Sequence, residues 1–177
     1  MDAPAPDPSV TNVVGTDFVS TWRQIVTNPA AFFATMPETG GLGDPLRFLA
    51  IVTGCNAIGT LLISPLAPWR AVLVLAALPL GSILVAAVLT LVTQHLFAAR
   101  AGFEPVFRAV AYGSAPAVLY WVPFVGQVAC GYAWYLQVRG LGRVQNLDPV
   151  PATLATLVVW AGMWLLCRSL AAPPIGW

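Results

Sequence analysis

The stretch AVLVLAALPLGSILVAAVLTLV, residues 71 to 92, contains no charged residue and is long enough to cross a bilayer as one helix. A hydrocarbon core of about 30 Å needs about 20 apolar residues in helical conformation. Charged residues make up 8% of the 177 residues and hydrophobic residues 58%, whereas a soluble domain carries about 25% charge. The sequence therefore predicts an all-α membrane protein, built as a polytopic helical bundle.

Other apolar segments of similar length lie on both sides of this stretch. The predicted membrane domain covers residues 46–172, with five transmembrane helices at about 46–66, 70–99, 105–122, 123–140 and 150–172. Prolines at 105, 123 and 149 stand at the expected helix starts, where a missing N–H group costs least. Because the third and fourth spans are almost continuous, they require a tight turn near Val122. A short tail, 173–177, follows the domain.

Arginine positions indicate the orientation of these spans. All eight basic residues are arginine, and cytoplasmic loops usually carry the excess of positive charge. With five spans and a cytoplasmic N-terminus, only Arg70 and Arg168 fall outside, so the C-terminus is expected outside. The arginines expected inside are Arg23, Arg47, Arg100, Arg108, Arg139 and Arg143. No run of like charge occurs, which argues against a nucleic-acid partner.

The chain before the first span divides into two parts. Residues 1–17 are rich in proline and aspartate, without the pattern of a signal peptide, and are predicted to be a disordered tail. Residues 18–45 carry aromatic side chains at helical spacing, among them Trp22, Phe32 and Phe33. We expect an amphipathic helix, broken at Asn28-Pro29, that lies in the membrane interface. Packing of this segment against the cytoplasmic end of the bundle is an equal alternative.

Residues that could support catalysis are sparse. No Asp or Glu lies inside a predicted span, which argues against a proton-coupled pump. Cys55, Cys130 and Cys167 stand singly, without metal-ligand spacing. The single histidine, His95, has no serine paired with it by any sequence rule, although an intramembrane enzyme would need such a nucleophile. We therefore expect no enzymatic activity, no cofactor and no metal.

Polar residues and prolines inside the spans leave a second function open. Pro79 and Pro116 are predicted to bend their helices. A small transporter or channel-like protein could use these bends together with Asn56 and Gln127, and it would need a continuous polar cavity. A scaffold predicts a packed bundle instead. Two pairs of small residues four apart predict faces where helices approach closely: Cys55 with Gly59, and Gly126 with Cys130.

Four stretches together resemble the Yip family of membrane proteins, named for Ypt/Rab-interacting proteins. They are WRQIVTNPAAFFATMP (22–37), PLRFL (45–49), FEPVFRAVAYGSAPAVLYWVPFVG (103–126) and WYLQVRGLGRV (134–144). The resemblance extends from about Thr16 to Cys167 and implies a five-helix membrane domain with a cytoplasmic N-terminus and no catalytic residues. Eukaryotic members act in vesicle trafficking and Rab binding, but the Asp-Leu-Tyr-Gly-Pro motif of several of them is missing here. The absence of lysine and the alanine-rich spans fit a bacterial member in the cytoplasmic (inner) membrane.

The expected function is that of a non-enzymatic scaffold or adaptor, in one version an auxiliary subunit of a larger membrane complex. Its partners would be membrane lipids and other membrane protein subunits. Arg108 is expected to reach the cytoplasmic interface and to pair with Glu104, one helical turn earlier. The candidate contact residues for partners and lipids are Trp22, Phe32, Phe33, Arg100, Arg108, Arg139 and Arg143.

Overall fold

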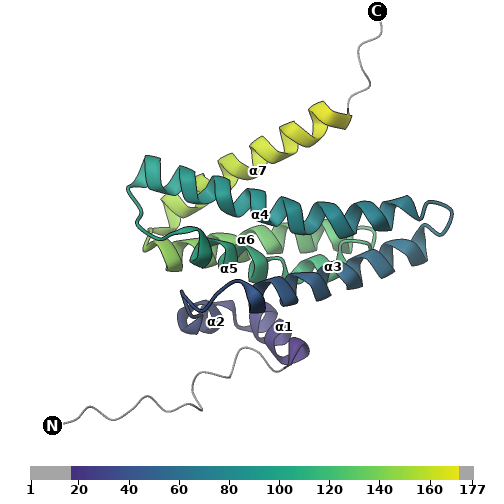
Figure 1. Ribbon diagram of the computed structural model, residues 1–177, viewed down its shortest axis with the longest axis horizontal. Helices are drawn as coiled ribbons and strands as arrows, with labels where there is room; N and C mark the ends of the chain where they lie inside the picture. Colours follow the sequence, from purple (N-terminus) through teal and green to yellow (C-terminus); the bar gives the residue numbers. More distant parts are fainter. Residues whose placement is uncertain (1–16, 172–177) are drawn as a thin grey trace, which may run out of the picture.

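The computed structural model describes residues 17–171, and all regular structure in this range is helical (Figure 1). The elements are α1 (Phe18–Thr27), α2 (Pro29–Thr35), α3 (Gly43–Ile63), α4 (Trp69–Phe97), α5 (Phe103–Gly113), the 3₁₀ helix η1 (Ala115–Leu119), α6 (Val125–Gln145) and α7 (Pro149–Ala171). The predicted tail at 1–17 lies outside the described residues except for Asp17, and the predicted tail at 173–177 lies outside them entirely. The all-α class predicted from the sequence is confirmed for the part described.

Helices α3 and α4 form an antiparallel hairpin, and both are long and apolar enough to cross a membrane. Helix α3 ends at Ile63 because Pro65 drives the preceding Ser64 out of helical conformation. Helix α4 continues through Pro79 over 29 residues. Large apolar side chains on the outside of the hairpin are strongly exposed, including Leu62 and Leu80. Such a surface suits lipid and not water.

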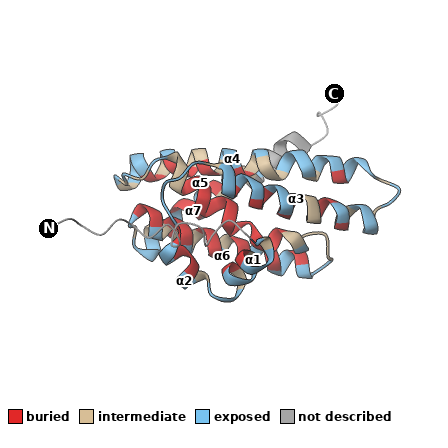
Figure 2. Cartoon of the chain, turned by 60° about the horizontal axis from the view of Figure 1, so that its bottom comes forward, coloured by how far each residue is buried: buried red, intermediate tan, exposed pale blue. Residues whose placement is uncertain are grey.

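Helix α5 lies at the centre of the fold. Every residue from Val106 to Gly113 is buried, and the helix packs against α3, α4 and α6. Figure 2 shows this as a mostly red helix among helices whose outer faces are blue. A helix that is buried on all sides must satisfy its polar groups within the protein, which makes the polar residues of α5 structurally informative.

The third predicted span, 105–122, is not a single α-helix. Helix α5 ends at Gly113, and the 3₁₀ helix η1 follows. Pro116 explains the change, because it has no N–H group and its ring collides with the carbonyl group four residues earlier. The bend predicted at Pro116 is therefore a break. The turn expected near Val122 is present, with Pro123 inside it, so that α6 begins at Val125.

Helices α6 and α7 complete the bundle. Helix α6 packs against α5 and α7, and α7 begins at Pro149, as its sequence predicts. The C-terminal part of α7 tilts away from the other helices (Figure 1). The short helices α1 and α2 lie on the opposite side of the bundle, beside η1 and α6.

Candidate functional site

One end of the bundle gathers most of the arginines, and we call it the arginine-bearing end. The start of α3 and α5 and the end of α4 and α6 meet there, linked by side-chain hydrogen bonds. Gln145 of α6 donates to the Thr93 hydroxyl of α4 at 2.9 Å and accepts from the Ala101 backbone N–H at 3.1 Å. The arginines of this end are Arg47, Arg100, Arg108, Arg139 and Arg143, whereas Arg70 lies at the start of α4, at the other end of the α3–α4 hairpin.

An ion pair between a buried arginine and a partly exposed glutamate lies at this end. Arg108 is 2% exposed, and its Nη2 atom lies 3.3 Å from Glu104 Oε1 and 2.6 Å from the Gly41 carbonyl oxygen. The same Glu104 oxygen accepts from the Gly41 N–H at 2.7 Å. The pairing predicted from the four-residue spacing is confirmed. Arg108 does not reach the interface as expected, because its guanidinium is enclosed between α5 and the loop before α3.

That loop is shaped to receive the guanidinium. Gly40 and Gly41 have φ angles of 124° and 85°, a backbone conformation that residues other than glycine rarely adopt. A Cβ atom at Gly40 would stand 3.2 Å from Arg108 Nη2. The loop is therefore held at Gly41 through both its N–H and its carbonyl group. In the described residues, Arg108 Nε and the Tyr112 hydroxyl are buried without a hydrogen-bond partner.

Phe32 and Phe33 face the protein. They are 3% and 2% exposed, and the Phe32 ring meets the Tyr112 ring edge to face at 5.2 Å. Phe33 lies so close to Gly140 of α6 that a Cβ atom there would come within 2.9 Å of the ring. These two side chains are thus not placed for the lipid contact expected from the sequence. The alternative, packing on the bundle, describes this segment.

Trp22 is half-buried and ties α1 to the break in the third span. Its indole Nε1–H donates to the Ala115 carbonyl at 2.8 Å, where the helix changes from α to 3₁₀. Tyr132 of α6 donates to the Val26 carbonyl at 2.8 Å, near the end of the same helix. The outward face of α1 is polar, with Ser20, Arg23 and Gln24 exposed. Helix α1 therefore belongs to the bundle on one side and presents polar groups on the other.

Replacing Trp22 by phenylalanine should loosen α1 without unfolding the bundle. The change keeps an aromatic ring but leaves the Ala115 carbonyl without its donor, at a cost of about 1 to 3 kcal/mol for a buried acceptor. We expect faster proteolytic cleavage within residues 18–35, measured by limited proteolysis in detergent. Val19→Ala, on the exposed side of α1, is the control and should leave the cleavage rate unchanged. Equal rates for Trp22→Phe and the wild type would contradict this role.

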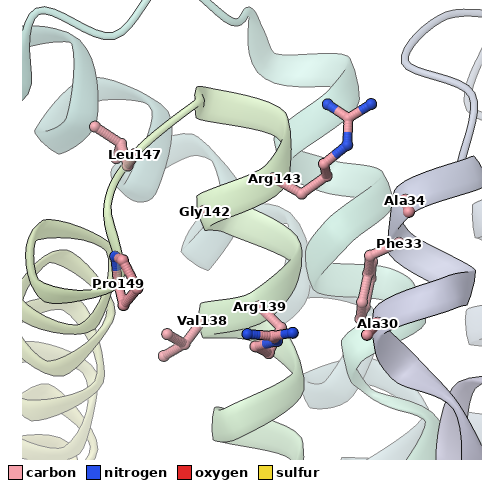
Figure 3. A pocket seen from close by; sticks show the side chains of 9 residues that line it. All are labelled: Ala30, Phe33, Ala34, Val138, Arg139, Gly142, Arg143, Leu147 and Pro149. Atoms are coloured by element: carbon pink, nitrogen blue, oxygen red, sulfur yellow. The ribbon is translucent and has the colours of Figure 1, made fainter.

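Arg139 and Arg143 line a pocket of about 220 Å³ between α2, α6 and the start of α7 (Figure 3). Both side chains are exposed. Arg143 lies 3.3 Å from Glu38 Oε1, and Arg139 forms no ion pair with a described acidic residue. Arg100 is also exposed, but it lies in the loop between α4 and α5 and does not line this pocket. The arrangement suits binding of an anionic group.

The residues considered for catalysis or transport are not brought together. His95 is exposed in the last turn of α4, and no described serine is hydrogen bonded to it. A pocket of about 150 Å³ lies between α4, α5, α6 and α7, and its lining includes Leu78 and Ala117, the sequence neighbours of Pro79 and Pro116. Ser82, Ser114 and Gln137 line it, and Gln137 accepts from the Trp160 indole at 2.9 Å. Asn56 and Gln127 are not among its lining residues.

Several of these contacts join residues far apart in the sequence and were not predicted. The bond from Trp22 to Ala115 spans 93 residues, and the contact of Gly41 with Arg108 spans 67. The sequence gives a signal only for the second contact. This signal consists of two adjacent glycines, Gly40 and Gly41, and of an arginine, Arg108, that stands three residues inside a predicted helix.

The comparisons with known proteins identify the family of the chain. The family model of the Yip1 domain matches residues 23–167, which includes α2 to α6, the loop held by Arg108, the second half of α1 and most of α7. No curated protein and no solved structure matches the chain. The match covers most of the chain, and the apolar helices agree with it. The chain belongs to the Yip1 domain family and is a membrane protein of that family.

Proposed function

We propose that this protein is a non-enzymatic scaffold or adaptor of the bacterial cytoplasmic membrane, with five membrane crossings and a cytoplasmic N-terminus. In this proposal, α3, α4, the broken segment α5–η1, α6 and α7 cross the membrane. The arginine-bearing end faces the cytoplasm and binds other membrane protein subunits and lipids. The Yip family is not a known enzyme family.

One observation carries the proposal: most of the exposed arginines of the described residues lie at one end of the bundle. Arg100, Arg139 and Arg143 are exposed there, beside the buried Arg108 that holds the loop before α3. Positive charge on one side is the usual mark of the cytoplasmic face. Exposed arginines that project from packed helices suit contact with a partner better than they suit catalysis.

Site-specific crosslinking tests this proposal. A photoreactive residue at position 100, at the arginine-bearing end, should capture one protein in constant ratio from native membranes. The same residue at position 70, which is also an exposed arginine but lies at the opposite end, is the matched control and should not capture it. Mass spectrometry of the crosslinked product provides the readout. The absence of any product from position 100, or identical products from both positions, would count against the scaffold.

A small transporter or channel is the second candidate, and one observation favours it. The pocket between α4, α5, α6 and α7 lies where the α5–η1 break and the Pro79 region meet, and broken helices form binding sites in transporters. Its volume of about 150 Å³ is small, and Asn56 and Gln127 lie elsewhere. Solute flux through liposomes that contain the purified protein, absent from empty liposomes, would favour this candidate over the scaffold.

A further inference from the structure

The pocket between α2, α6 and α7 is positively charged and has apolar walls. Its lining includes two arginines and no acidic residue. Phe33, Val138, Leu147 and Pro149 are among the apolar residues that line it. Figure 3 shows that the two guanidinium groups project from successive turns of α6. A ligand for this pocket must therefore combine negative charge with apolar surface.

The dipole of helix α6 explains the position of only one of the two arginines that line the pocket. The negative end of a helix favours cations only within its last turn. Arg143 lies in the last turn of α6, but Arg139 lies a full turn earlier. Since Arg139 has no acidic partner among the described residues, its charge is available to a ligand.

Glu38 shows that the pocket edge accepts an oxyanion. Its carboxylate lies 3.3 Å from Arg143, and the two side chains are 51% and 45% exposed. An exposed pair of this kind is weak, about 0 to 1 kcal/mol, so another anion can replace the carboxylate. Guanidinium groups bind phosphate particularly well because two N–H groups can face two oxygens.

The surroundings favour a lipid over a dissolved anion. Beyond Pro149, the outward side chains of α7 are apolar and exposed, among them Val150, Leu154 and Leu157. A dissolved phosphate gains no favourable contact with such a surface, whereas a phospholipid would place its acyl chains there and its headgroup at the arginines. Basic pockets between membrane helices on the cytoplasmic side are typical sites for anionic headgroups.

We propose that Arg139 and Arg143 bind the phosphate of an anionic phospholipid whose acyl chains lie along α7, and that Glu38 competes with this phosphate for Arg143. This inference deepens the proposed function and rests on it only in that the chain lies in a bilayer. The purified protein suffices for the test, so that a failure of the scaffold role, which needs a partner, is distinguished from a failure of lipid binding.

Native mass spectrometry of the full chain in detergent provides the test. Phosphatidylglycerol and phosphatidylcholine with the same acyl chains are added separately, and dissociation constants are compared. The wild type should bind one phosphatidylglycerol more tightly than any phosphatidylcholine. Arg139→Gln and Arg143→Gln should each weaken this binding about fivefold, and the double variant should show no preference. Glu38→Gln should tighten it several-fold, because Arg143 is freed.

Arg47→Gln is the matched control, because it removes the same charge from an exposed arginine of the same end outside the pocket. It should leave the affinity unchanged. An equal loss in Arg47→Gln and Arg139→Gln would overturn the site and leave only a diffuse charge effect. Equal binding of the two lipids by the wild type would overturn it as well. Displacement of phosphatidylglycerol by an equal concentration of inorganic phosphate would show that the ligand is a dissolved anion.

Discussion

Replacing Glu104 by alanine should lower the free energy of unfolding by about 3 to 5 kcal/mol, the cost of leaving a buried charge without its partner. The Arg108 side chain is 3% exposed and has two oxygen partners, the Gly41 carbonyl and Glu104, whose side chain is 34% exposed, so the charge left without its partner is that of the buried arginine. Alanine removes the negative partner and also the acceptor of the Gly41 N–H. We therefore expect the loop before α3 to detach. The free energy of unfolding is measured in sodium dodecyl sulfate, with far-ultraviolet circular dichroism as the signal.

The second ion pair of the described residues provides a matched control. Glu38 and Arg143 are also 3.3 Å apart, but both side chains are about half exposed. Glu38→Ala makes the same chemical change and should alter the free energy of unfolding by less than about 1 kcal/mol. The double variant with Glu104→Gln and Arg108→Met should recover much of the loss, because it removes both charges. Similar losses for Glu104→Ala and Glu38→Ala would show that burial does not govern the Arg108 pair.

The sequence predicted local features of this fold well, because they depend on neighbours within a turn or two. The length of α4 follows from an uninterrupted apolar run, and the pairing of Glu104 with Arg108 follows from their spacing. Periodic aromatic residues correctly predicted that the segment around Trp22 is helical. The number of membrane crossings stays a prediction, since α3 and α4 are the described helices that pass the test of length and apolar character.

Burial could not be predicted, because it depends on segments distant in the sequence. An arginine three residues inside a helix start is ambiguous: it reaches the interface unless another segment covers it. Here the cover is the Gly40-Gly41 loop, which precedes Arg108 by 67 residues. Phe32 and Phe33 present the same ambiguity, because an apolar face suits lipid and a helix surface equally well.

The break after α5 illustrates a third limit. Proline inside a membrane helix bends it or ends it, depending on whether a neighbour satisfies the freed backbone groups. At Pro116 the neighbour is Trp22, which donates to the Ala115 carbonyl. With this carbonyl satisfied, the chain can leave the α-helix and turn toward α6. The donor belongs to α1, a segment for which the sequence left a position in the membrane interface and packing on the bundle equally open.

Glycine at position 126 should be essential to the turn that follows. A Cβ atom there would lie 2.5 Å from the Tyr120 carbonyl oxygen, closer than such atoms approach in proteins. The clash is with backbone, which cannot rotate away as a side chain would. Gly126→Ala should therefore destabilise the protein by at least about 1 to 3 kcal/mol, the usual cost of overpacking, in the same unfolding measurement.

For Gly131, on the same helix, we expect the opposite effect of an alanine substitution on stability. Nothing lies within 4 Å of a Cβ atom built there, so that Gly131→Ala adds a methyl group in open space. Alanine favours helix over glycine by about 1 kcal/mol, and Gly131→Ala should be neutral or stabilising. The two variants differ only in what the new methyl group meets, so the sign of their difference reports on the η1–α6 turn alone. A stable Gly126→Ala protein would mean that α6 does not approach Tyr120 this closely, and that the sequence signal of small residues at 126 and 130 marks some other contact.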